Sequence, residues 1–310
     1  MTTTEATGAY TVPASSIVVA TDGSEHAGRA VHWAADQAAL ERRPLIILTL
    51  VHGAVMPAAG IGAMSAVYSY SPQDLLDSGQ TLAREAIAAA RGLHPGLEVT
   101  GFAQIGEPRH LLIELSRTVH MIVLGSRGRG LFCSKLLGSV SAAVSRDASC
   151  PVVVCRPQRT QQHPAAGILV GADGTPESLP VVEFAFRQAS LTGQPLTVVH
   201  AVWDAVAAAQ GPGPVSPAET ALEEYRVLLA ESVAGIAPKF PEVEVELRLT
   251  RGMAEDCLRD TSGEWSLIVV GRHPVDTFAR LVTGAVATAV VERSHSNVAV
   301  VPETRSDAGH

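Results

Sequence analysis

The most constraining feature of this chain is that its sequence repeats once. Residues 17–24 (IVVATDGS) and 168–175 (ILVGADGT) share a short apolar run followed by Asp, Gly and a hydroxyl residue, and they lie 151 residues apart. Because the repeats of solenoids are several times shorter, this spacing indicates a duplicated domain. Three glycines further on recur 146 residues later: Gly106 as Gly252, Gly125 as Gly271, and Gly138 as Gly284.

Within each copy, short apolar runs alternate with amphipathic segments of helical length, which is typical of α/β domains. The runs at 121–124 and 267–270 are apolar at every position, as expected for parallel strands covered by helices on both faces. The fold class expected is therefore α/β, with two tandem doubly wound, Rossmann-like parallel-sheet domains. In the first copy we expect strands near 17–21, 45–51, 97–103, 120–125 and 152–156, and helices near 25–43, 73–93, 107–118 and 139–148.

The repeat also predicts the domain boundaries. Residues 1–16 are polar and are expected to be a flexible tail, and the polar, Pro-containing stretch 158–166 is the expected linker between domains at 17–157 and 167–302. Residues 52–72 are too long for a simple turn. They form either a mobile lid over a site or a disordered excursion.

The composition argues against several classes of function. A net charge of -8 opposes general binding to nucleic acid, whose phosphates are held by clustered Lys and Arg, so no nucleic-acid partner is expected. The longest nearly apolar run, at 44–51, is too short to cross a bilayer, so no membrane partner is expected either. The four Cys include no C-x-x-C pair, and the His lack zinc-ligand spacing. Neither disulfides nor a structural metal is expected, and we predict a cytoplasmic protein.

A glycine pattern after the fourth expected strand is the part of the sequence that says most about ligand binding. It reads GSRG at 125–128, then nine residues, then Gly138 and Ser139. Ligands of doubly wound sheets bind beyond the carboxyl ends of the strands, where Asp22 is also expected. Gly125 and Gly128 would let backbone amides approach an oxyanion.

The start of the following helix adds to this anion site. Gly138, Ser139 and Val140 would offer amides at a helix N-terminus, where the macrodipole favours negative charge. Arg127 and the nearby Arg129 and Lys135 could supply positive charge. A simpler interpretation is that the glycines only form turns in loops and that Ser139 only caps a helix. The Asp-Gly pair at Asp22 is likewise good turn chemistry.

The pattern G-x2-G-x9-G-[ST], the early Asp22 and a Cys-Pro-Val-Val-Val run at 150–154 together resemble the universal stress protein family. The resemblance covers both copies, and it implies an adenine nucleotide alpha hydrolase-like fold and the family's ATP-binding subgroup. It implies that Asp22 holds ribose or adenine, while Ala20, Leu50 and Leu124 border the base or sugar. The phosphates, bridged by Mg²⁺, would be received by Gly125, Gly128, Gly138, Ser139 and Val140.

The second copy departs from the pattern. Pro274 replaces the second glycine, which removes an amide, and Ala285 replaces the hydroxyl residue. Asp173, Gly271 and Gly284 survive. We therefore expect ATP mainly in the N-terminal domain, with a second site that is weak or empty.

No familiar catalytic motif accompanies the glycine pattern. The chain lacks G-x4-G-K-[ST], G-x-S-x-G and H-E-x-x-H, and isolated residues such as His26 and His120 are typical of surface or satisfied histidines. The leading hypothesis is a regulatory ATP-binding protein of the stress or growth response, with an unidentified regulatory protein partner. A slow ATPase or phosphotransferase and a nucleotide-free interaction scaffold are the alternatives. The resemblance further implies that the two copies pack like paired single-domain members, with a homodimer of the chain expected on the same ground.

Overall fold

The computed structural model describes residues 12–51, 71–128, 137–157, 166–259, 265–272 and 280–304. Most of the expected lid at 52–72 and of the expected linker at 158–166 therefore lies outside the described residues. Of the expected tail, residues 12–16 are described. Val12 packs on the core, and the Ser16 amide donates to the Pro13 carbonyl at 3.0 Å.

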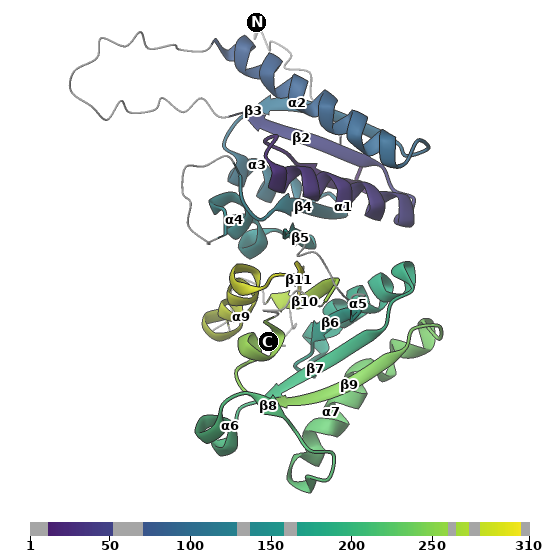
Figure 1. Ribbon diagram of the computed structural model, residues 1–310, viewed down its shortest axis with the longest axis vertical. Helices are drawn as coiled ribbons and strands as arrows, with labels where there is room; N and C mark the ends of the chain where they lie inside the picture. The colour runs from purple at the N-terminus through teal and green to yellow at the C-terminus, as the bar shows by residue number, and fades with distance from the viewer. Residues whose placement is uncertain are drawn as a thin grey trace, which may run out of the picture.

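Each copy alternates strands and helices as the sequence predicts (Figure 1). The first copy contains β1 (Ile17–Ala20), α1 (Glu25–Glu41), β2 (Leu45–Val51), α2 (Pro72–Leu93), β3 (Val99–Ile105), α3 (Pro108–Leu115), β4 (Met121–Gly125), α4 (Ser139–Asp147) and β5 (Val152–Cys155). The second contains β6 (Ile168–Gly171), η1 (Pro176–Ser178), α5 (Leu179–Thr192), β7 (Leu196–Val202), α6 (Ala205–Gln210), β8 (Gly213–Pro214), η2 (Thr220–Leu222), α7 (Glu223–Ala234), η3 (Ala237–Lys239), β9 (Val245–Arg251), α8 (Ala254–Leu258), β10 (Leu267–Arg272), α9 (Arg280–Arg293) and β11 (Asn297–Pro302).

The described strands form one sheet in the order β3-β2-β1-β4-β5-β11-β10-β6-β7-β9-β8. All pairs within the first copy are parallel, and the second copy adds an antiparallel edge pair, β8 with β9. The expected α/β fold is confirmed. The structure adds that the two doubly wound halves share a single sheet.

The two halves meet through an antiparallel pair of strands, β5 and β11. Val153 pairs with Ala299, which is its own counterpart in the second copy. On either side, Val152 pairs with Val300 and Val154 with Val298. An approximate two-fold axis therefore passes between Val153 and Ala299, and the last strand of each copy covers the edge of the other.

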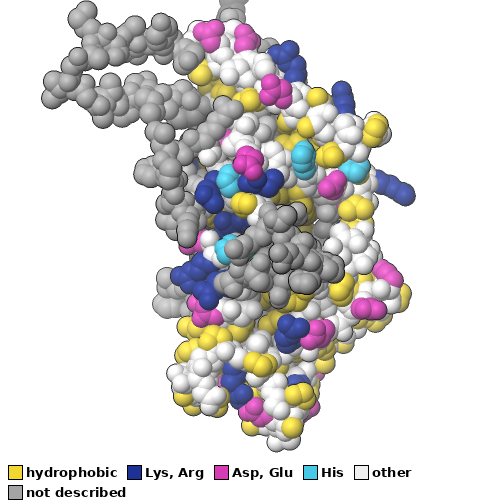
Figure 2. Space-filling model, in the orientation of Figure 1, with side chains coloured by type: hydrophobic (Ala, Val, Ile, Leu, Met, Phe, Trp, Pro, Cys, Tyr) yellow, Lys and Arg dark blue, Asp and Glu magenta, His cyan; other side chains and the backbone are white. Residues whose placement is uncertain are grey.

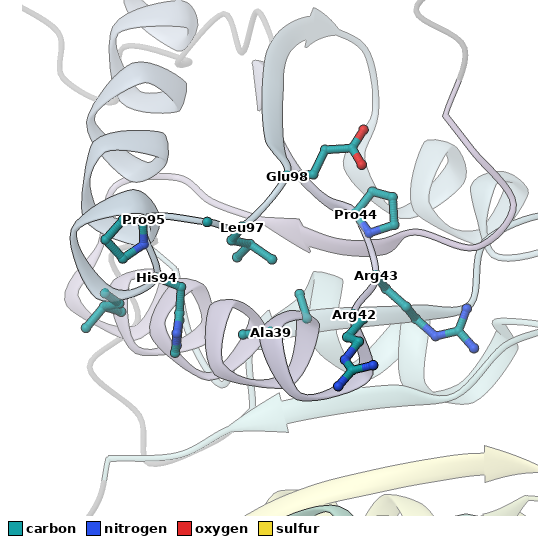
Figure 3. Close-up of a pocket in the computed structure, with 11 residues that line it drawn as sticks. Ala39, Arg42, Arg43, Pro44, His94, Pro95, Leu97 and Glu98 are labelled. Atoms are coloured by element: carbon teal, nitrogen blue, oxygen red, sulfur yellow. The ribbon is translucent and has the colours of Figure 1, made fainter.

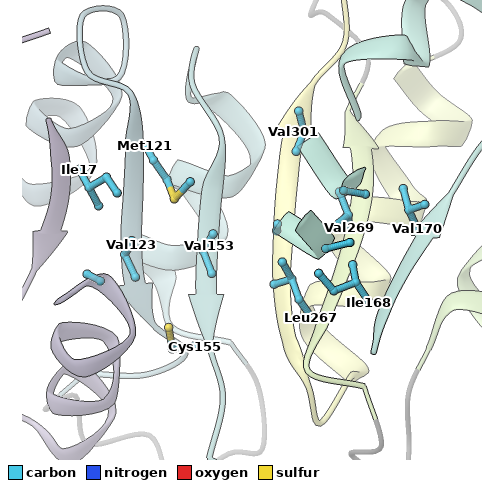
Figure 4. Close-up of a cluster of buried hydrophobic side chains, with 14 of the residues drawn as sticks. Ile17, Met121, Val123, Val153, Cys155, Ile168, Val170, Leu267, Val269 and Val301 are labelled. Atoms are coloured by element: carbon cyan, nitrogen blue, oxygen red, sulfur yellow. The ribbon is translucent and has the colours of Figure 1, made fainter. Parts of the chain in front are cut away.

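Two layers of buried apolar side chains cover the two faces of this sheet. One layer contains residues of α1 and α2, and the other contains residues of α3 and α4, so the helices of the first copy lie on opposite faces. Figure 4 shows the first layer crossing the junction, from Ile17, Val123 and Val153 to Val301 and Val269. The core is thus continuous between the copies.

Several boundaries differ from the sequence-based expectation by two or three residues, among them the ends of β3, the end of α1 and the end of α3, which is at Leu115 rather than 118. Two of these differences have local reasons. The third strand begins at Val99 rather than near 97, because the Leu97 amide donates to the His94 carbonyl at 3.0 Å and closes a turn. Helix α1 ends at Glu41, since Arg42 adopts a left-handed conformation (φ 54°) that stops the helix before Pro44.

A buried carboxylate at the end of α1 ties the helix to β4. The Glu41 side chain is 4% exposed and lies 2.8 Å from His120 Nε2. It also accepts from Gln37 Nε2 at 2.6 Å and from Arg43 Nε at 2.8 Å. Burial favours the neutral acid, but the three hydrogen bonds outweigh it and lower the pKa of Glu41 from 4.5 to about 2.

We predict that Glu41→Gln lowers the free energy of unfolding at pH 7 by about 2 kcal/mol, a magnitude typical of hydrogen bonds to a buried charge. Because the folded-state pKa is depressed, the stabilisation is present above pH 4.5 and is lost as the pH falls towards 2. Urea unfolding of both proteins at pH 7 and pH 3 measures this. The control is Glu114→Gln, an exposed carboxylate 4.0 Å from His110. Equal stability of Glu41→Gln and the parent at pH 7 would contradict the assignment.

Candidate functional site

The candidate site lies at the carboxyl ends of β1 and β4. These neighbouring strands lead into helices on opposite faces of the sheet, which is where doubly wound folds bind ligands. The segment 21–24 follows β1, and the GSRG segment at 125–128 follows β4. The start of α4 closes the third side.

The structure brings Asp22 and Gly128 together. Asp22 Oδ1 accepts from the Ser24 amide at 3.0 Å, which fixes the turn before α1. A Cβ atom added to Gly128 would lie 2.5 Å from Asp22 Oδ2. The Asp22 carboxylate therefore lies against the Gly128 backbone, and a side chain at 128 would displace it. What the pair binds stays a prediction.

The beginning of α4 is held close to the same loop. Gly138 is the N-cap residue, and its amide donates to the Ser126 carbonyl at 2.9 Å. The expectation that Gly138 offers a free amide is therefore wrong, because the loop itself uses that donor. The amides of Ser139 and Val140 fall in the first turn, where no helical carbonyl is available to them. A Cβ at Gly138 would lie 3.4 Å from Arg127 Cα.

Close packing against α1 requires a glycine at position 125, which the sequence did not indicate. A Cβ at this position would lie 2.7 Å from the backbone carbonyl of His26 and 2.9 Å from the Ala27 amide. The glycine thus lets the first turn of α1 rest directly on β4. Its expected role toward a phosphate stays a prediction.

The three residues expected to border the base or sugar differ in exposure. Leu124 is 3% exposed and packs into the core layer beside α3 and α4, so little of its side chain is accessible. Ala20 and Leu50 are only partly buried and pack on the edge of the same layer. Of the three, Ala20 and Leu50 offer more surface to a ligand.

The sequence analysis expected Arg127 here but missed the other polar side chains beneath the GSRG loop, while the expected Arg129 and Lys135 lie outside the described residues. His26 Nδ1 lies 3.1 Å from Ser126 Oγ and 2.9 Å from Arg29 Nη2. Because a guanidinium only donates, Nδ1 is an acceptor and His26 is neutral. Burial lowers the pKa of His26, and the charges of Arg29, Arg127 and Arg156 lower it further. A cationic group therefore lines this side of the first crevice.

The second crevice holds mainly carboxylates, with the Arg272 guanidinium beside them. Asp173 Oδ1 accepts from the amide of Thr175 at 2.9 Å and from its hydroxyl at 2.7 Å. The Glu303 carboxylate lies directly against Gly271, in the space that a Cβ would occupy. Burial and the carboxylates of Asp173 and Glu177 raise the pKa of Glu303 to about 7.

The repeat shows how this difference arises. At the spacing of 151 residues, Glu177 takes the place of His26. In the first copy Gly125 pairs with Cys155, which Arg156 follows. In the second copy Gly271 pairs with the residue before Pro302, so a proline takes the place of Arg156. This comparison of the two copies is the signal that could have identified the cationic group.

The helix start also differs between the copies. Helix α9 begins at Arg280, so Gly284 lies inside the helix, whereas its counterpart Gly138 lies just before α4. An amide inside a helix is used by the helical hydrogen bonds. The second copy therefore presents a different helix N-terminus from the first.

A hollow of about 480 Å³ lies at the opposite edge of the first copy, beside Pro44 and the C-terminal ends of α1 and α2 (Figure 3). Two of the polar side chains that line it, those of His94 and Arg43, already have partners. His94 Nε2 lies 2.7 Å from Asp36, and Arg43 binds Glu41 and the Ser15 carbonyl. This hollow is a weaker candidate than the crevice.

The described residues form no metal-binding cluster and no membrane-spanning helix. No group of three or more His, Cys, Asp or Glu side chains within them is placed to hold a metal ion. None of the helices in this part of the chain is both long and apolar enough to cross a bilayer.

Comparison with known proteins agrees with the fold and the duplication. The universal stress protein family matches residues 14–156 and 167–302. A universal stress protein of Mycobacterium tuberculosis is 32% identical over 295 residues, covering 93% of this chain and 97% of that protein. One from Mycolicibacterium smegmatis is 30% identical over 286 residues, covering 92% and 96%.

A solved universal stress protein from Archaeoglobus fulgidus has the same fold. Its TM-score is 0.65 at 19% sequence identity, and the match covers 93% of this chain and 98% of that chain. A second solved structure, from Pseudomonas aeruginosa, has a TM-score of 0.59 at 16% identity and covers 93% of each chain. The expected resemblance is confirmed: this chain belongs to the universal stress protein family and carries two of the family's domains in tandem.

Proposed function

We propose that this protein binds ATP in the crevice of its first copy and acts as a regulatory nucleotide-binding protein of the stress or growth response. The observation that carries the proposal is the contrast between the two crevices. The first combines Asp22, Gly128 and the start of α4 with a cationic group. The second has three carboxylates, of Asp173, Glu177 and Glu303, in the corresponding place, with one guanidinium, of Arg272, beside Glu303. The first crevice therefore attracts a polyphosphate more strongly than the second does.

Phosphate groups fit the first crevice for two further reasons. The first-turn amides of α4 favour negative charge, as does the helix macrodipole. Gly128 is exposed to solvent, although the Asp22 carboxylate lies against one side of it. Since the described residues contain no metal-binding cluster, the phosphate oxygens and water would supply most ligands of an accompanying Mg²⁺.

The remaining parts of the proposal concern the whole chain. Within the proposed domains, 17–157 and 167–302, nucleotide binding in the first would be sensed through the shared sheet. Binding rather than turnover would be the output, read by a regulatory protein partner or by a homodimer of the chain. A cytoplasmic location fits the thiols of Cys150, Cys155 and Cys257, which are free.

We predict one ATP bound per chain, and we predict that Gly138→Glu abolishes binding. The new carboxylate would lie beside the first turn of α4, where it repels phosphate. Isothermal titration with MgATP measures both stoichiometry and affinity. Gly284→Glu is the matched control in the second copy and should bind ATP as the parent does. Two equivalents of similar affinity in the parent, or unchanged affinity in Gly138→Glu, would refute the proposal.

A smaller change tests the pairing of Asp22 with Gly128. We predict that Gly128→Ala weakens ATP binding about tenfold, equivalent to roughly 1.4 kcal/mol, because the methyl group displaces the Asp22 carboxylate. Asp22→Ala should weaken binding by a similar factor, and the double variant should lose little more. Fully additive losses would show that the two residues act separately.

The rival enzyme hypothesis predicts turnover. We expect purified protein with MgATP to release phosphate far more slowly than about 1 per second, an ordinary enzyme rate. A phosphate-release assay of the parent and Asp22→Ala measures this. Turnover at that rate or above, removed by Asp22→Ala, would favour an ATPase or phosphotransferase.

A further inference from the structure

Arg127 and Arg156 are placed side by side by the pairing of β4 with β5. Gly125 pairs with Cys155, and the Ser126 amide donates to the Cys155 carbonyl at 3.0 Å. Ser126 and Arg156 therefore leave the sheet from adjacent strands, which lie about 4.8 Å apart in a β-sheet. Arg127 follows directly.

The Arg156 side chain is buried at the junction of the two copies. The residue is 6% exposed, and its Nε and Nη2 atoms have no hydrogen-bond partner within the described structure. Its backbone amide donates to Asn297 Oδ1 of the second copy at 2.9 Å. Arg127 Nε and Arg29 Nε are likewise buried without a partner. Several guanidinium donors at one place are thus unsatisfied.

The carboxylates near these arginines are those of Asp22, which lies against Gly128, and of Glu25 and Glu292. Burial and the charge of Arg127 lower the pKa of Arg156 to about 10, and Glu292 on α9 opposes the shift. Glu25 pairs with Arg29 and is itself exposed. In Figure 2, Lys, Arg and His side chains lie together near the middle of the face shown, with Asp or Glu beside them. The segment 129–136, which follows Gly128, contains no Asp or Glu in its sequence.

Buried guanidinium groups without counterions are costly, because each loses its hydration and gains no partner. Phosphate suits such a group, since its several oxygens accept hydrogen bonds from the guanidinium forks of more than one arginine. The Ser126 hydroxyl, 3.1 Å from His26 Nδ1, lies at the same place.

We propose that Arg127 and Arg156, with Arg29 and Ser126 beside them, bind a phosphate group at the junction between the two copies. The group is either free inorganic phosphate or the terminal phosphate of a nucleotide in the same crevice. Only the second source rests on the proposed function. Because Asn297 and Glu292 come from the second copy, occupancy would tie the two copies together through Arg156.

The first test uses inorganic phosphate and no nucleotide. The full chain is titrated calorimetrically with potassium phosphate at an ionic strength held constant with chloride. One saturable site per chain is expected, with a dissociation constant of about 1 mM or tighter. Arg156→Met and Arg127→Met should each weaken it at least tenfold, while Arg84→Met, on the exposed face of α2, should not. Circular dichroism checks the fold of each variant. If Arg156→Met does not fold, the phosphate affinity of Arg127→Met tests the proposed site.

The second test identifies the source of the phosphate. If phosphate binding persists in saturating ATP, free phosphate is the ligand. If ATP abolishes it, and Arg156→Met weakens ATP binding more than ADP binding, the site holds the terminal phosphate. Phosphate binding by a protein that binds no ATP would support this site while refuting the proposed function. Absence of a saturable phosphate site together with unaltered ATP affinity in both arginine variants would overturn the inference.

Discussion

The antiparallel pairing of β5 with β11 is the constraint on which the rest of the molecule depends. All four residues of β5 are buried and apolar, so as an uncovered edge this strand would expose both its backbone and its side chains to water. The last strand of the second copy supplies the missing neighbour, in a register centred on Val153 and Ala299. The pairing makes one sheet from two and extends a single core layer across the junction.

The same pairing sets the surroundings of the first crevice. Arg156 follows β5 directly, so the junction buries it and brings it to Asn297 and to the charge of Glu292. The symmetric position in the second copy is Pro302, and the next residue, Glu303, lies against Gly271 instead. An approximately symmetric backbone therefore carries one crevice lined by arginines and another lined mainly by carboxylates. This asymmetry, more than the loss of one glycine and one hydroxyl, is why we assign phosphate binding to the first copy.

Much of this could be predicted from the sequence, because it depends on local patterns. The alternation of apolar runs and amphipathic segments located the nine helices and strands that the structure describes in the first copy, although β3 begins later because a turn at His94 uses the Leu97 amide. The approach of Asp22 to Gly128 follows from the shared edge of parallel strands. The reason for Gly125 could not be inferred, since nothing near it in the sequence indicates that the backbone of α1 packs there.

By itself, the sequence determined the duplication, the α/β class, the family and the loss of part of the glycine pattern in the second copy. These properties depend on the spacing and type of residues along the chain, and both can be read directly from the sequence. Only the tertiary structure decided that the copies share one sheet, that the Gly138 amide donates its hydrogen bond to the Ser126 carbonyl, and that Arg156 is buried beside Arg127. The burial of a side chain, the partners of its hydrogen-bond donors and the charges around it depend on which segments, distant in sequence, come into contact. At the junction of the two copies, the pairing of β5 with β11 determines those contacts.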